Sequence, residues 1–265
     1  MGIWRLLKPE VGDAFTNMAV DEAIMKARIE DRVPNTLRFY QWNPSAVSIG
    51  RFQTLDNEIH VQNCKKHGVD IVRRITGGGT VYHDSVGEIT YSIVAKTREL
   101  GCADLDLLSA YQKICSGLNE AVKILGAKAE FHPPDPKRCP NLTIRGRKIS
   151  GNAQSSKKGV LLQHGTFLLD IDHTKMFTFL KVPWAKTLND VLKVSKRKLT
   201  SAKQELKSQF SMEEAYQALV KGFEKALNVQ LVEEKLTEYE QKLAERLRKE
   251  RFATEDWTFL GKASV

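Results

Sequence analysis

The sequence lacks any long apolar segment and contains few cysteines. No apolar run approaches the roughly 20 residues of a membrane-spanning helix, and the amino terminus lacks the apolar region of a secretory signal. The cysteines, Cys64, Cys102, Cys115 and Cys139, form neither a Cys-x-x-Cys pair nor a pattern of metal ligands. We therefore expect reduced thiols in a cytoplasmic protein that makes no membrane contact.

The chain carries a net charge of +9, yet its basic residues form no nucleic-acid-binding motif. One denser basic stretch runs from Lys186 to Lys207, without the aromatic residues or the helix-turn-helix pattern that would read bases. A basic patch of this kind can attract an acidic carrier protein, and a solvated lysine-rich surface is the common alternative. We expect no nucleic-acid partner.

Three consecutive glycines, Gly77, Gly78 and Gly79, stand between two expected strands at residues 71–75 and 80–83. Three glycines lose much backbone entropy on folding, which predicts that something approaches this backbone closely. A glycine-rich hairpin is the alternative. The spacing matches neither a Walker loop nor a dinucleotide fingerprint, so the loop would act through its own N–H groups, with positive charge from Arg73 or Arg74.

The remaining pattern alternates groups of strands with inserted helices. Strands are expected at residues 36–42, 46–52, 88–95, 142–144, 148–150 and 160–169, and helices at 16–30, 56–66 and 106–125. Asn43-Pro44-Ser45 suits a hairpin turn between the first two strands, and residues 132–140 form a proline-rich loop. A helical segment, with capping boxes at Ser211 and Thr237, covers about residues 203–260. This order indicates an α+β fold, with residues 1–265 as a single catalytic domain.

The motif Arg-Arg-x-x-Gly-Gly-Gly-x-Val-x-His-Asp begins at Arg73, and Gly146-Arg147-Lys148-Ile149-Ser150-Gly151-Asn152-Ala153-Gln154 precedes Gln163-His164-Gly165-Thr166. Weaker matches lie at residues 17–22, 48–53 and 254–257. In this order they resemble the lipoate–protein ligase A family of the biotin/lipoate ligase superfamily. The resemblance implies a mixed β-sheet covered by helices. It also implies that the accessory domain of some bacterial ligases is absent or is supplied by a separate subunit.

The resemblance also implies the site residues. Lys148 is the first catalytic candidate, because its ammonium would bind the acyl carbonyl and a phosphate oxygen; an exposed hairpin lysine is the alternative. The expected acyl or adenylate contacts are Arg73, Arg74, Thr76, Gly77, Gly78, Gly79, His83, Ser150, Gly151, Ala153, His164 and Gly165. Neighbouring strand residues point to opposite faces, so only one arginine should face the site, and we favour Arg73. His164 could equally be a buried core histidine.

Residues 138–142, Arg138-Cys139-Pro140-Asn141-Leu142, depart from the ligase pattern. Ligases of the family usually carry Asn-Asp here, and the acid helps to hold Mg²⁺ and the nucleotide. Asn141 would be a weaker Mg²⁺ ligand. Cys139 instead resembles the thiol of the cysteine-dependent octanoyltransferases in the same superfamily, which carries the acyl group as a thioester. The intact triple glycine favours the ligases.

The sequence therefore predicts attachment of a lipoyl or octanoyl group to a lysine of a lipoyl-carrier domain, of the glycine cleavage H-protein or 2-oxoacid dehydrogenase E2 type. We favour a lipoate–protein ligase that uses ATP, Mg²⁺ and lipoate through lipoyl-AMP. The alternative is an ATP-independent octanoyl or lipoyl transferase that uses a Cys139 thioester and no cofactor. A non-catalytic subunit that binds lipoyl domains is a third possibility, disfavoured by the intact glycine and lysine motifs. Biotin–protein ligase fits less well, since its nucleotide motif differs.

Overall fold

The computed structural model describes residues 2–102, 106–133, 140–206 and 210–261. An eight-stranded mixed sheet forms its centre, in the strand order β11-β1-β2-β6-β10-β9-β8-β7. The strands are β1 (Gly2–Gly12), β2 (Thr36–Trp42), β6 (Glu88–Lys96), β7 (Glu130–His132), β8 (Asn141–Ile144), β9 (Arg147–Lys157), β10 (Val160–Leu168) and β11 (Val229–Glu234). β1 pairs in parallel with β2 and β11, and the other pairs are antiparallel. The predicted α+β class, with a mixed sheet covered by helices, is confirmed.

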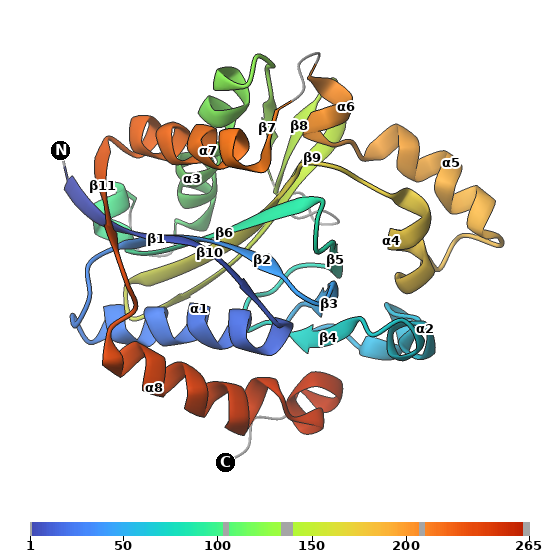
Figure 1. Cartoon of the computed structure of the whole chain (residues 1–265), viewed down its shortest axis with the longest axis horizontal. Coiled ribbons are helices and arrows are strands. Elements are labelled where there is room, and N and C mark those ends of the chain that lie inside the picture. Colours follow the sequence, from blue (N-terminus) through green and yellow to red (C-terminus); the bar gives the residue numbers. More distant parts are fainter. Residues whose placement is uncertain (1, 103–105, 134–139, 207–209, 262–265) are drawn as a thin grey trace.

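Helices cover both faces of this sheet (Figure 1). One face carries α1 (Ala14–Ile29) and α8 (Glu238–Leu247), and the other carries α3 (Leu107–Ile124) and α7 (Met212–Leu227). α3 and α7 pack closely because Gly222 faces Gly117, where an added Cβ would lie 2.5 Å from the Gly117 carbonyl oxygen. The predicted helix at 106–125 and both capping boxes are confirmed. α1 begins at Ala14, two residues before the predicted start at residue 16, because the Asp13 side chain caps the helix by accepting from the backbone N–H of Thr16.

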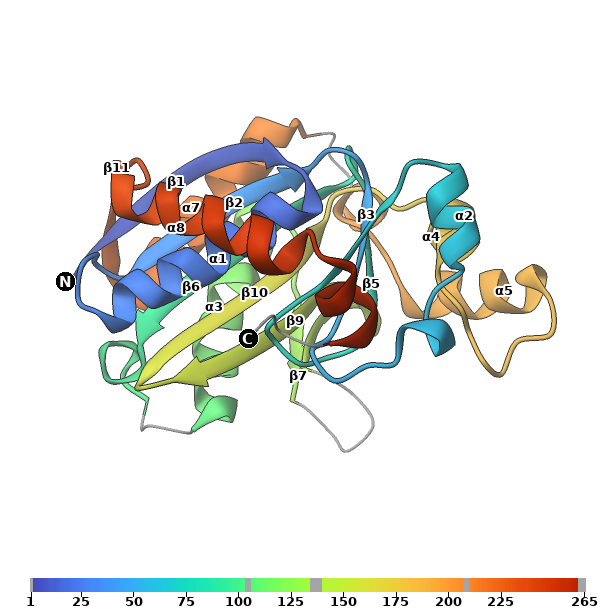
Figure 2. The same cartoon turned by 90° about the horizontal axis from the view of Figure 1, so that it is seen from below.

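A second, three-stranded sheet in the order β4-β3-β5 lies beside the first. It consists of β3 (Ala46–Ile49), β4 (Asp70–Arg73) and β5 (Val81–His83). The helices α2 (Val61–Lys66), α4 (His173–Phe179) and α5 (Leu188–Lys198) lie at this end of the molecule (Figure 2), whereas α6 (Ala202–Glu205) lies near β8 (Figure 1). The predicted hairpin between residues 36–42 and 46–52 is wrong. β2 pairs with β1 and β6 of the large sheet, whereas β3 pairs with β4 and β5. The same turn chemistry serves a chain that crosses between sheets.

Further elements differ from the sequence-based prediction. β1 was not predicted, because its buried residues 4–7 are consecutive and show no alternation. β11 interrupts the expected helical segment at 203–260; it is an edge strand with mostly exposed residues and also shows little alternation. The predicted helix at 56–66 is two elements, a short helical turn at Leu55–Asn57 and then α2. Another short helical turn lies at Thr97–Leu100, and π-helical turns lie at Arg248–Phe252 and Asp256–Leu260. In the part of the chain that the structure describes, no helix is long and apolar enough to cross a membrane. The single-domain assignment stays a prediction.

Candidate functional site

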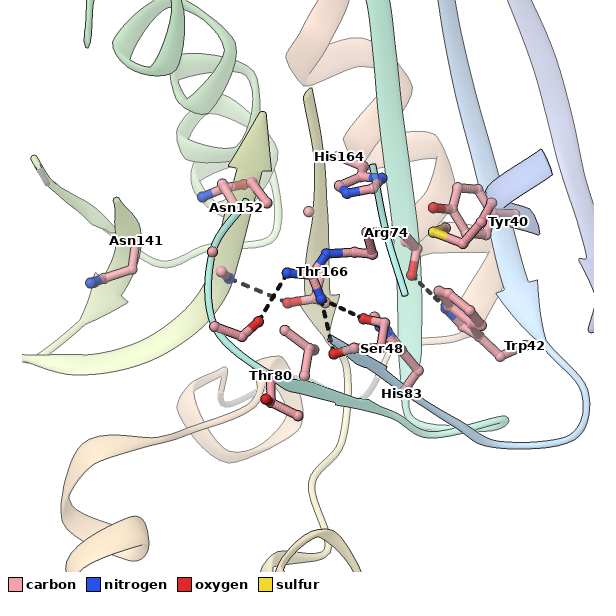
Figure 3. Close-up of a pocket in the computed structure, with 18 of the residues that line it drawn as sticks. Tyr40, Trp42, Ser48, Arg74, Thr80, His83, Asn141, Asn152, His164 and Thr166 are labelled. Carbon is pink, nitrogen blue, oxygen red and sulfur yellow. Dashed lines mark hydrogen bonds between the residues drawn. The ribbon is translucent and has the colours of Figure 1, made fainter. Parts of the chain in front are cut away.

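A cavity of about 430 Å³ opens between the two sheets (Figure 3). This volume is typical of a small-molecule site. The lining comes from α1, from both sheets and from the glycine-rich loop. Its residues are Met18, Tyr40, Trp42, Ser48, Arg74, Gly78, Gly79, Thr80, Val81, His83, Thr90, Asn141, Lys148, Gly151, Asn152, Ala153, His164, Gly165 and Thr166. Apolar and aromatic walls with a few polar groups suit an apolar ligand that has one polar end.

The triple-glycine loop crosses the end of β3 and is not a hairpin. β4 and β5 both pair with β3, in parallel and antiparallel fashion, so the loop must pass over the residue that ends β3. That residue's successor is Gly50, where an added Cβ would lie 2.0 Å from the carbonyl oxygen of Gly78. Gly78 itself has a φ of 90°, a conformation that favours glycine. Close backbone approach therefore requires glycine at position 50, and the backbone conformation favours it at position 78. Gly78 and Gly79 also line the cavity.

Arg74, not Arg73, lines the cavity, so the preference for Arg73 is wrong. The Arg73 guanidinium donates to backbone carbonyls on two segments, among them Gln53 at 2.8 Å and Thr258 at 3.0 Å, and so ties the carboxyl-terminal turns to β3's loop. Its donors point away from the cavity because neighbouring strand residues face opposite sides.

Arg74 holds the glycine loop in place. Its Nη2 atom donates to the carbonyl oxygens of Gly77 and Gly79, both at 2.9 Å, and its Nη1 atom donates to the carbonyl and hydroxyl of Ser48. Its Nε atom donates to the hydroxyl of Thr76 at 3.3 Å. A guanidinium has five N–H groups, and this set engages all five. We therefore assign Arg74 to positioning the loop, not to direct contact with a ligand.

Two hydrogen-bonded chains of the same chemistry start from Arg74. In the first, the Ser48 hydroxyl lies 2.7 Å from Nε2 of His83, and Nδ1 of His83 lies 2.8 Å from Oε1 of Glu88. All four side chains are buried, and the His83 ring stacks on Trp42 with 3.9 Å between ring centroids. The wall of the cavity thus contains a buried sequence of guanidinium, hydroxyl, imidazole and carboxylate groups.

The second chain runs through the other cavity histidine. The Thr76 hydroxyl lies 2.8 Å from Nε2 of His164, whose Nδ1 lies 3.0 Å from Oδ2 of Asp21. Burial lowers the pKa of His164 below its usual value, against the opposite effect of Asp21, so the imidazole is neutral. Burial would raise the pKa of Asp21, but the hydrogen bond from His164 and the charge of Arg38 bring it below its usual value. A neutral His164 that donates to an ionised Asp21 offers Nε2 as the acceptor for Thr76.

Lys148 reaches the cavity because β9 contains a β-bulge. Leu142 pairs with Ser150 and Thr143 with Lys148, so Ile149 is the extra residue. Lys148 and Gly151, three residues apart, would point to opposite faces of a regular strand, and the bulge re-aims Lys148. A Cβ added at Gly151 would lie 2.7 Å from Nζ of Lys148, and the strand partner of Gly151 is Asn141. The ammonium group, Gly151 and Asn141 therefore share one end of the cavity.

Most predicted site residues meet at this cavity. Those that line it are Arg74, Gly78, Gly79, His83, Asn141, Lys148, Gly151, Ala153, His164 and Gly165. Those that do not are Arg73, Thr76 and Ser150, which are buried outside the lining, and Gly77, which is half-buried. His164 lines the cavity, and both of its ring nitrogens are hydrogen-bonded inside the protein. It is therefore both a cavity residue and a buried core histidine, the two alternatives left open by the sequence.

Cys139 lies outside the described residues. The described cysteines do not line the cavity. Burial raises the pKa of Cys64 to about 11 and that of Cys115 to about 12, and it also raises the pKa of Cys102. These thiols stay protonated near neutral pH and are poor nucleophiles.

A family model for the lipoyl protein ligase A/B catalytic domain matches residues 13–224. The chain belongs to this family. Octanoyltransferase LipM of Geobacillus kaustophilus is 34% identical over 97% of this chain and 98% of its own length. The protein of the same name from Halalkalibacterium halodurans is 35% identical over 98% of this chain and 99% of its own. A bi-partite lipoate protein ligase from Thermoplasma acidophilum has the same fold, with a TM-score of 0.85, 29% identity and coverage of 98% and 97% of the two chains.

Because the family includes ATP-dependent ligases, we tested the cavity as a site for Mg²⁺. This ion is usually bound through one or two carboxylates together with phosphate oxygens. The described cavity lining contains neither Asp nor Glu. Asn141, the weaker Mg²⁺ ligand predicted from the sequence, does line the cavity but supplies no carboxylate. Within the described ranges, no three His, Cys, Asp or Glu side chains are placed to hold a metal ion. The described residues do not fit Mg²⁺.

The sequence analysis missed part of the lining of this cavity. Tyr40, Trp42, Thr90 and Met18 line the cavity without belonging to a motif that was given a role. Asp21 and Ser48 lie inside the weaker matches at residues 17–22 and 48–53, so those matches contained a usable signal. The aromatic residues of β2 carried none, because a strand pattern does not show which face meets a cavity.

Proposed function

We propose that this protein transfers an octanoyl group from an acyl thioester to a lysine of a lipoyl-carrier domain, with Cys139 as the acyl-carrying nucleophile. The observation that carries this proposal is the placement of Lys148 Nζ over Gly151, whose strand partner Asn141 follows Cys139 by two residues. A two-residue separation corresponds to at most about 7 Å between Cα atoms. The names of the relatives with 34% and 35% identity support transfer of octanoyl in particular.

The chemistry requires a nucleophile, a charge at the carbonyl oxygen and a dry channel. The Cys139 thiolate attacks the carbonyl carbon of the octanoyl thioester, and the Lys148 ammonium, at the end of the cavity, would stabilise the negative oxygen. When the donor's carbon–sulfur bond breaks, the donor leaves as a thiolate that takes up a proton from water, and the acyl group remains on Cys139. The neutral amine of the carrier lysine then attacks this thioester, an amide bond forms, and Cys139 leaves as a thiolate while the amine loses one proton to water.

The cavity suits the acyl group of such an intermediate. Gly78 and Gly79 present bare backbone along one wall, and Tyr40 and Trp42 close the end near β2. Arg74 holds that loop with N–H groups that are all hydrogen-bonded to the protein, so they are not directed at the acyl chain. An apolar channel with a cationic group at one end matches a fatty acyl thioester.

The ATP-dependent ligase that the sequence analysis favoured is less well supported. The relatives with the identities given above are octanoyltransferases, and the described lining does not fit Mg²⁺. The similar solved structure from Thermoplasma acidophilum is a ligase, so the shared fold does not separate the two mechanisms. A non-catalytic binding subunit would not need the buried histidine chains or the re-aimed Lys148.

The test compares Cys139→Ser with Cys102→Ser, whose cysteine lies outside the cavity. After incubation with an octanoyl thioester, the parent protein should gain the mass of one octanoyl group on Cys139, removable by hydroxylamine. The Cys139→Ser variant should lose the adduct and transfer to a lipoyl domain, whereas Cys102→Ser should retain both, and ATP should have no effect. Retained transfer by Cys139→Ser, with pyrophosphate released from ATP and lipoate, would overturn the proposal and favour the ligase.

A further inference from the structure

The acyl cavity has two ends on different strands of the large sheet. Asn141 on β8 lies on the opposite side of the cavity from Tyr40 and Trp42 on β2 (Figure 3). Lys148 on β9 belongs to the Asn141 end, because its Nζ atom lies over Gly151, the strand partner of Asn141. β2 and β9 are three strand spacings apart in the order β2-β6-β10-β9, which corresponds to about 14 Å. After a contact distance of about 3.5 Å is subtracted at each end, the length available to a ligand between the two ends is about 7 Å.

The aromatic residues at the β2 end are fixed by hydrogen bonds. Nε1 of Trp42 donates to the hydroxyl of Thr90 at 2.8 Å, and the Trp42 ring is stacked on His83. The Tyr40 hydroxyl donates to Asp21 at 3.0 Å, with its ring 5.6 Å from that of Trp42. Neither ring can move away without leaving a buried polar group unpaired.

Met18 is the adjustable part of the same end. It lies on α1, is 3% exposed, lines the cavity and packs in one core cluster with Tyr40 and Trp42. Its neighbours on the helix are bonded to β2 or its side chains: Asn17 donates to the carbonyl of Gln41 at 3.0 Å, and Asp21 accepts from Tyr40. A methionine side chain is unbranched and flexible, and it adapts to the shape of a cavity.

We propose that Met18 sets the length of the acyl chain that this cavity accepts. This inference rests on the proposed function, which places the acyl carbonyl beside Lys148. An extended eight-carbon chain has seven carbon–carbon bonds and spans about 9 Å, which is within about 2 Å of the length available. A longer chain must displace the thioether, because the two aromatic rings are held.

The consequence is a predicted shift of chain-length preference. One methylene too many or too few in an apolar pocket changes specificity by roughly tenfold or more. Met18→Ala removes three side-chain heavy atoms and should lengthen the cavity by about 3–4 Å, enough for two or three further carbons. Met18→Phe should shorten it and favour chains of about six carbons.

The experiment measures transfer from six-, eight-, ten- and twelve-carbon acyl thioesters to a lipoyl domain, together with calorimetric binding of the corresponding free fatty acids. Met18→Ala should raise the ratio of ten-carbon to eight-carbon kcat/KM at least about tenfold, and the binding optimum should move in the same direction. Met18→Phe should move both the opposite way.

The matched control is Met25→Ala. Met25 is the same residue type, two helical turns further along α1, 4% exposed and outside the cavity lining. It should lose stability as Met18→Ala does, yet keep the parent's chain-length profile. An unchanged profile in folded Met18→Ala would overturn this inference. If the parent binds fatty acids with an eight-carbon optimum but never transfers them, the proposed function fails and the role of Met18 in binding stands.

Discussion

The ammonium group of Lys148 fills the space above Gly151, so that any side chain at position 151 would collide with it. An added Cβ would lie 2.7 Å from Nζ and 2.9 Å from Cε. The bulge at Ile149 places the lysine there, and the absence of a side chain at Gly151 leaves the room. The two residues thus act as a unit at the end of the cavity where the proposed function places the acyl carbonyl.

Lys148→Ala should reduce transfer to a lipoyl domain by about 10²–10³, the usual effect of removing one group that stabilises a developing oxyanion. Single-turnover transfer, with circular dichroism as the check on folding, measures this. Lys157→Ala, an exposed lysine at the far end of the same strand, should leave the rate unchanged. Gly151→Ala should also slow transfer, because it displaces Nζ. Full activity in a folded Lys148→Ala protein would contradict the role.

Gly79→Leu should block acyl binding without unfolding the protein. A Cβ at Gly79 meets no atom within 4 Å, and the residue lines the cavity, so the new side chain would occupy ligand space. Gly77→Leu is the matched control, since its Cβ also meets nothing within 4 Å and it does not line the cavity. Calorimetry with octanoate should show loss of binding in the first variant only. Equal affinities in both variants would remove the loop from the acyl site.

The stability of the protein should fall as the pH drops below about 6.5. Burial lowers the pKa of His164 in the folded state, so the unfolded chain binds more protons and acid favours unfolding. His60 and His173, whose pKa values burial also lowers, act in the same direction. Urea unfolding at pH 7.5 and 5.5 should therefore show a smaller pH effect in His164→Gln than in the parent. An identical pH effect in both would mean that His164 contributes nothing to it.

The basic helix α5 should speed the encounter with an acidic carrier domain. Its exposed residues include Lys193, Lys196 and Arg197, and just beyond it Thr200 donates to the carbonyl of Lys148 at 2.9 Å. Exposed charges are screened beyond about 10 Å at 0.1 M salt, so kcat/KM for the carrier should decrease as salt rises. Lys193→Glu should weaken this salt dependence, whereas Lys221→Glu on α7 should not. A flat salt profile in the parent would make α5 an ordinary solvated surface.

The sequence by itself determined the family, the α+β class and most of the residues that meet at the cavity. The features that carried this information are local in the sequence: the triple glycine, the lysine motif, and the caps at Ser211 and Thr237. These features depend on neighbours along the chain. The role of Cys139 is predicted from the sequence alone and stays a prediction.

Only the tertiary structure decided which side chains face the ligand space. Strand alternation showed that Arg73 and Arg74 differ, but the crossing of the loop over β3 determined that Arg74 faces the cavity and that Arg73 binds the carboxyl-terminal turns. A bulge at Ile149 redirected Lys148, and an extra residue of this kind leaves no trace in an apolar pattern. Tyr40, Trp42 and Met18 became an end wall only because β2 and α1 pack side by side, a contact between distant segments that no local pattern specifies.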